Sequence, residues 1–149
     1  MPSQAVETKS LRLEPCLLVS VQAPEADVER IMAAVIRLTP LAIGSYDRNV
    51  FRSAADIEYY RPLEGAAAGA EASARRRPGI VELSFQLPMD QELLAQALEA
   101  VFQVHSYQEP LIVVREVLAS RSKGLDDRNN PHRWWNTTGD WKKEALPNA

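Results

Sequence analysis

The densest group of chemically useful side chains lies between residues 105 and 110, which read His105, Ser106, Tyr107, Gln108, Glu109 and Pro110. An imidazole and a carboxylate this close together can bind a divalent metal ion. The same side chains can instead give hydrogen-bond partners to the backbone where a helix ends and a strand begins. The candidate site residues here are His105, Tyr107 and Glu109, and for His105 we favour the junction hydrogen bond.

The sequence does not contain the pattern of ligands that a complete metal centre requires. Zinc and copper sites normally take about four ligands from histidine, cysteine and carboxylate side chains. The chain has two histidines and one cysteine, and neither an H-x-x-x-H nor a C-x-x-C pattern occurs. We therefore expect no cofactor within one chain. The alternative is a divalent metal ion shared between subunits by His105 and Glu109.

A second group of polar side chains lies between residues 46 and 64. Arginine and tyrosine side chains there suit an anionic or planar ligand. The same residue types are enriched at protein–protein interfaces, and both roles are compatible if the ligand binds between subunits. The candidate residues are Tyr46, Arg48, Arg61 and Glu64.

Several function classes are disfavoured by composition and motifs. The sequence has no G-x-S-x-G, no G-x-G-x-x-G and no P-loop motif, so we do not favour an enzyme. The net charge of −3 gives no general attraction to nucleic acid, and we expect Arg75, Arg76 and Arg77 to lie in a solvated loop. No apolar run approaches the roughly 20 residues of a membrane helix, and no secretory signal is evident. The lone Cys16 fits a reducing cytoplasm.

The 149 residues fit one domain, with a core over about 14–118 and a C-terminal extension over about 119–149. Apolar runs predict strands at 16–22, 80–87 and 111–117. Three- and four-residue spacing predicts one helix before Pro40 and another N-capped by Asp90. Residues 41–53 and 57–63 are expected to pair as a hairpin, followed by a long loop over 64–78. This order predicts an α+β, ferredoxin-like β-α-β-β-α-β fold with an extra hairpin strand and both helices on one face.

The C-terminal extension contains all three tryptophans, Trp134, Trp135 and Trp141. A free tail would not normally carry so much apolar surface. We expect this Trp-rich segment to dock on its own sheet or on a neighbouring subunit.

Four blocks of sequence resemble known families. Residues 105–110 resemble the H-P-Y-E-E-P segment of the NIF-three-like proteins. The blocks Ile43-Gly44-Ser45-Tyr46-Asp47-Arg48 and Tyr60-Arg61-Pro62-Leu63-Glu64-Gly65 look like stand-alone relatives of that family's inserted domain, which is similar in fold to the CutA and PII proteins. Trp134-Trp135-Asn136 also looks like CutA. The resemblance implies a PII/CutA-like homotrimer that binds a small molecule or ion at subunit boundaries in a regulatory role.

The sequence also departs from these families. Ser106 replaces the usual proline and Gln108 a glutamate, which weakens any metal role carried over from relatives. The full-length NIF-three-like proteins hold a metal pair through domains that flank the insert, and two histidines cannot rebuild that centre. Two alternatives stay open: a divalent-metal-binding, CutA-like tolerance protein, and an accessory domain of a NIF-three-like hydrolase.

Overall fold

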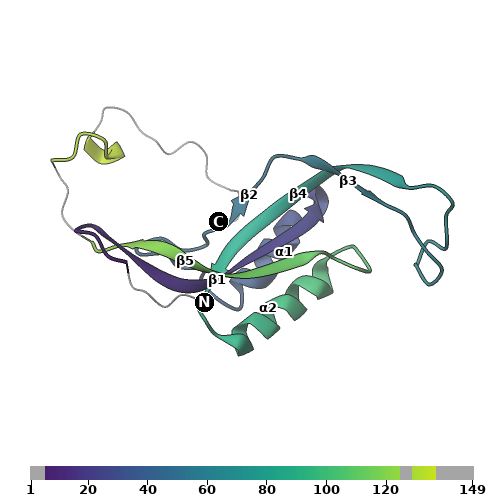
Figure 1. The fold of residues 1–149 in the computed structure, drawn as a ribbon, viewed down its shortest axis with the longest axis horizontal. Coiled ribbons are helices and arrows are strands. Elements are labelled where there is room, and N and C mark those ends of the chain that lie inside the picture. Colours follow the sequence, from purple (N-terminus) through teal and green to yellow (C-terminus); the bar gives the residue numbers. More distant parts are fainter. Residues whose placement is uncertain (1–5, 125–128, 137–149) are drawn as a thin grey trace.

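The computed structural model describes residues 6–124 and 129–136 of the chain. A sheet is covered on one face by two helices, as Figure 1 shows. This confirms the α+β, ferredoxin-like architecture predicted from the order of elements. The elements are β1 (Leu11–Pro24), η1 (Glu25–Asp27), α1 (Val28–Ile36), β2 (Phe51–Arg52), β3 (Asp56–Tyr60), β4 (Arg75–Leu87), α2 (Gln91–Val104), β5 (Ile112–Ser122) and η2 (Trp134–Asn136).

The sheet has the strand order β2-β4-β1-β5, and β3 also pairs with β4. All of these pairings are antiparallel. The central strand β1 pairs on both sides, so that Val19 lies between Phe85 of β4 and Val114 of β5. Because β1 is central, its pairing fixes the positions of β4 on one side and β5 on the other.

The core lies between the sheet and the helices. Leu17, Val19 and Val21 alternate along β1 and are almost completely buried, because successive side chains of a strand point to opposite faces. They pack with Ile31 of α1 and Val101 of α2. Burial of each such side chain contributes roughly 2 kcal/mol to stability.

The other face of the sheet carries neither helix (Figure 1). We call it the helix-free face. The register places on it the alternate residues of β1, β4 and β5, and the hydroxyls of Ser20 and Ser84 meet there at 3.3 Å. Its members include Leu18, Ser20, Gln22, Ser84, Gln86, Val113, Arg115 and Val117. This surface mixes half-buried aliphatic groups with polar ones.

The hairpin expected between residues 41–53 and 57–63 is not formed. Instead β2 and β3 pair one after the other with the same edge of β4, where Phe51 faces Ser84 and Tyr60 faces Arg75. Residues 41–50 form a loop because Leu41 and Arg48 adopt positive φ angles of 52° and 56°. The Asn49 side chain also donates to the Leu41 and Tyr46 carbonyls, which a strand would have paired.

The hairpin that does form joins β3 to β4 and extends beyond the helical layer (Figure 1). Its connecting segment, residues 61–74, is called the tip loop here. Arg75, Arg76 and Arg77 begin β4, so their predicted placement in a solvated loop is wrong. Their cross-strand partners in β3 are Tyr60, Tyr59 and Glu58, and this pairing keeps the run extended.

Trp134 and Trp135 lie in η2 and contact each other edge to face, with ring centroids 5.9 Å apart. Trp141 lies outside the described residues, so docking of the Trp-rich segment stays a prediction. Among the helices of the described ranges, none is both long and apolar enough to span a membrane.

Candidate functional site

His105 ends α2 and ties it to the central strand. Its backbone turns extended and its side chain is buried. The Tyr107 N–H donates to Nδ1 at 3.0 Å, so Nε2 carries the proton and donates to the Gln22 carbonyl at 2.7 Å. Both ring nitrogens are therefore engaged, and a metal ion would have to displace one of these bonds.

Asp27, in η1, is the second buried polar group at this junction, and only 2% of it is exposed. Its Oδ2 accepts the Ser106 N–H at 2.9 Å and the Ser106 hydroxyl at 2.7 Å. Its Oδ1 accepts from Arg30 at 2.5 Å, and Arg30 also donates to the Val104 carbonyl. Serine suits this position because proline, found there in the resembled motif, has no N–H to donate.

Two opposing effects act on the Asp27 carboxyl. Burial alone would raise the pKa of Asp27. The hydrogen bonds from Ser106 and Arg30 lower the pKa by more than burial raises it, so the pKa lies below its ordinary value of 3.8. The carboxylate is therefore ionised at neutral pH and joins the start of α1 to the end of α2.

We expect this carboxylate to contribute to acid unfolding. Because its folded-state pKa is lowered, its stabilising contribution is complete above about pH 4 and is lost as the pH falls through the folded-state pKa. Urea unfolding measured from pH 7 down to pH 2 should show a smaller loss of stability for Asp27→Asn than for the wild type. Equal losses in the two proteins would contradict this assignment.

Tyr107 connects the junction to the hairpin. Its hydroxyl donates to Glu58 of β3, and the Arg77 guanidinium lies over its ring at 4.9 Å from the centroid. Burial, followed by the hydrogen bond to Glu58, raises the pKa of the Tyr107 hydroxyl. The tyrosine is therefore a neutral donor, and its ring offers a face to a cation.

Gln108 holds the tip loop. Its Oε1 accepts the Ala67 N–H at 2.8 Å and its Nε2 donates to the Gly65 carbonyl at 3.4 Å. The glutamate of the resembled motif could make the first bond but not the second, because a carboxylate has no proton to donate. The junction thus fixes a loop more than 40 residues away in sequence, as the separations of 41 and 43 positions show.

Replacing Gln108 by leucine should release the tip loop without unfolding the domain. We expect amide hydrogen exchange at Ala67 to accelerate roughly tenfold, because its acceptor is removed. Exchange of the core amide of Val19 should stay unchanged. Glu109→Leu is the matched control, since Glu109 is exposed. Equal exchange at Ala67 in both variants would contradict the anchoring role.

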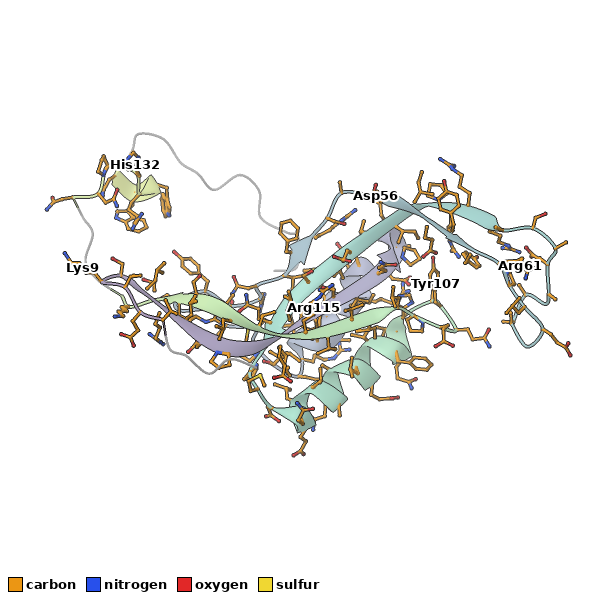
Figure 2. The ribbon with its side chains drawn as sticks, in the orientation of Figure 1. Lys9, Asp56, Arg61, Tyr107, Arg115 and His132 are labelled. Atoms are coloured by element: carbon orange, nitrogen blue, oxygen red, sulfur yellow. The ribbon has the colours of Figure 1, made fainter. Side chains whose placement is uncertain are left out.

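The structure brings together only part of the predicted site. His105 and Tyr107 contact each other, and Gln108 brings the tip loop, with Arg61 and Glu64, to the same end of the sheet (Figure 2). Glu109 is exposed beside them. Tyr46 and Arg48 lie towards the opposite end, because residues preceding β2 run antiparallel to β4 in the direction of Leu87.

Three residues of this site were missed by sequence reasoning: Asp27, Glu58 and Arg77. No local pattern marks Asp27 or Glu58 in the sequence, and Arg77 was expected in a solvated loop. In the residues that the structure describes, no three histidine, cysteine or acidic side chains gather as a metal site. The metal role of His105 and Glu109 stays a prediction.

Neither a protein-family model nor a curated protein sequence matches the chain. Solved structures do match. A Bacillus cereus protein related to NIF3 aligns with 70% of this chain at 22% identity and a TM-score of 0.58, and the chain covers only 26% of that protein. The periplasmic divalent cation tolerance protein CutA of Archaeoglobus fulgidus aligns with 70% of this chain and is itself covered to 84%, at 16% identity and a TM-score of 0.50.

A PII-like protein from Thiomonas intermedia, solved with ADP, AMP and bicarbonate, also matches over 72% of this chain and 94% of its own length. Its 14% identity and TM-score of 0.41 are too low to support an argument about ligands. The chain therefore has the fold of the CutA proteins and of the matched quarter of the NIF3-related protein.

Proposed function

We propose that the protein is a small regulatory binding protein that assembles into a homotrimer through its helix-free face. A small anionic ligand would bind at the subunit boundary beside the β3–β4 hairpin. The helix-free face is the observation that carries this proposal.

The helix-free face has the composition of an association surface. Leu18, Val113 and Val117 are half-buried on it, and Phe51 at its edge is 71% exposed. Sheets with one uncovered face and unpaired edges bury them by association or protect them with charges. Here Arg115 lies among the aliphatic residues, so the face offers both apolar area and a polar group for recognition between subunits.

The first three residues of β4, Arg75, Arg76 and Arg77, supply positive charge for a ligand. Arg75 is paired with Glu71, whereas the neighbouring Arg76 and Arg77 have no salt bridge within the described residues. Arg77 is held over the Tyr107 ring, and its cross-strand neighbour Glu58 accepts from Tyr107 and forms no salt bridge with Arg77. Guanidinium groups presented this way bind phosphate or carboxylate oxygens through paired N–H donors.

Inorganic pyrophosphate is a suitable probe for this site. We expect millimolar pyrophosphate to raise the thermal unfolding midpoint of the wild type by a few degrees. The increase should be lost in Arg77→Met. It should persist in Arg37→Met, which removes the same charge from the C-terminal end of α1. No increase in the wild type, or equal increases in both variants, would contradict the ligand role.

A further inference from the structure

A cavity of about 400 Å³ lies at the opposite end of the sheet from the hairpin. It is formed where the start of β1, the end of β4, the end of β5 and the segment after α1 converge. Its volume is in the range of pockets that hold small metabolites. It shares no residue with the junction at His105.

One wall of the cavity is polar and belongs to the margin of the helix-free face. Arg121 donates to the Gln86 Oε1 at 2.8 Å, and its Nε lies 3.1 Å from Glu14. The Cys16 thiol also donates to Gln86 Oε1, at 3.7 Å, and burial raises the pKa of this thiol. Cys16 is therefore a protonated, neutral part of the wall.

Two lining groups that can donate are left without a side-chain partner in the part of the chain that the structure describes. The Gln86 Nε2 and the Thr39 hydroxyl make no side-chain hydrogen bond with any described residue. Arg121 supplies the charge, and only 14% of its side chain is exposed. Such a set of donors around a cation is complementary to a ligand rich in acceptors, above all a carboxylate.

Glu14 can give up its place beside Arg121. Its side chain is 39% exposed, and it has a second cation, Arg12, at 3.7 Å. A ligand carboxylate could therefore take over the Arg121 contact while Glu14 remains near Arg12.

The rest of the lining is apolar, and one of its residues, Leu41, has a strained backbone. It is made by proline and aliphatic side chains: Pro15, Pro40, Leu41, Leu87, Pro88 and Met89. Leu41 is buried with a φ of 52°, in the left-handed region that side chains other than glycine rarely adopt. Strain of this kind is maintained by its surroundings and is concentrated at binding sites.

We propose that this cavity binds a small organic carboxylate with an apolar body. The carboxylate is held by Arg121, Gln86 and Thr39, and the body lies against the proline and leucine side chains. This site lies at the opposite end of the sheet from the ligand site proposed above, and its polar wall is at the margin of the same helix-free face.

Calorimetric titration of the full chain with benzoate tests the proposal, with benzamide as the neutral probe of the same shape. The wild type should bind benzoate at least tenfold more tightly than benzamide. Arg121→Met should weaken benzoate binding at least tenfold, and Glu14→Gln should tighten it severalfold because the competing charge is removed. Lys9→Met is the charge-matched control and should bind as the wild type does.

Light scattering on each variant ensures that the proteins compared have the wild-type mass. Equal affinities for benzoate and benzamide would overturn the proposal. Unchanged or weaker benzoate binding by Glu14→Gln would overturn it too, and this variant retains Arg121 and its bond to Gln86.

Discussion

Replacing Asp27 by alanine is expected to lower the free energy of unfolding by about 3 kcal/mol. The substitution removes the acceptor of the Ser106 N–H and hydroxyl, and it removes the charged partner of Arg30. The Asp27 carboxylate makes these bonds while almost completely buried, although Ser106 itself lies at the surface. The contact between η1 and the end of α2 is lost with them.

Urea unfolding at pH 7 and a fixed protein concentration measures this effect. Glu29→Ala is the matched control, because Glu29 is an exposed acid in the first turn of α1. We expect it to cost less than about 1 kcal/mol. A loss of similar size in the two variants would show that Asp27 does not hold the junction together.

Replacing Val113 by arginine is expected to dissociate the assembly into single chains. Val113 faces Ser20 near the middle of the helix-free face and is half-buried. An interface formed by this face would bury the new charge without a partner, at a cost of several kcal/mol. Within one chain the arginine can extend into solvent, so the fold should be retained.

Size-exclusion chromatography with light scattering and circular dichroism separates these effects. Gln96→Arg is the control, since it adds the same charge to an exposed position of α2. It should keep the wild-type mass and spectrum. If Val113→Arg also kept the wild-type mass, the helix-free face would not be the interface.

The helices and central strands were predictable because their signals are local. The strand expected at 80–87 is part of β4, where Val81, Leu83 and Phe85 are buried, and Asp90 does N-cap α2 by accepting the Leu93 N–H. The sequence also placed residues 105–110 at the turn from helix to strand. Each of these inferences depends on residues only a few positions apart.

The partners at the site were not predictable because they come from distant parts of the chain. Ser106 finds Asp27 79 positions away, and Tyr107 finds Glu58 49 positions away. These pairs meet only after the sheet and the two helices have packed together. The loop over residues 41–50 was missed for a different reason: Leu41 and Arg48 take positive φ angles that glycine usually marks in a sequence.

The most direct test of the proposed function is the mass of the unmodified protein in solution. Light scattering at micromolar concentration should give about three times the chain mass of 16.6 kDa. Trimerisation would cover the helix-free face and place each β3–β4 hairpin beside a neighbouring subunit. A mass of 16.6 kDa across the whole concentration range would contradict the proposal.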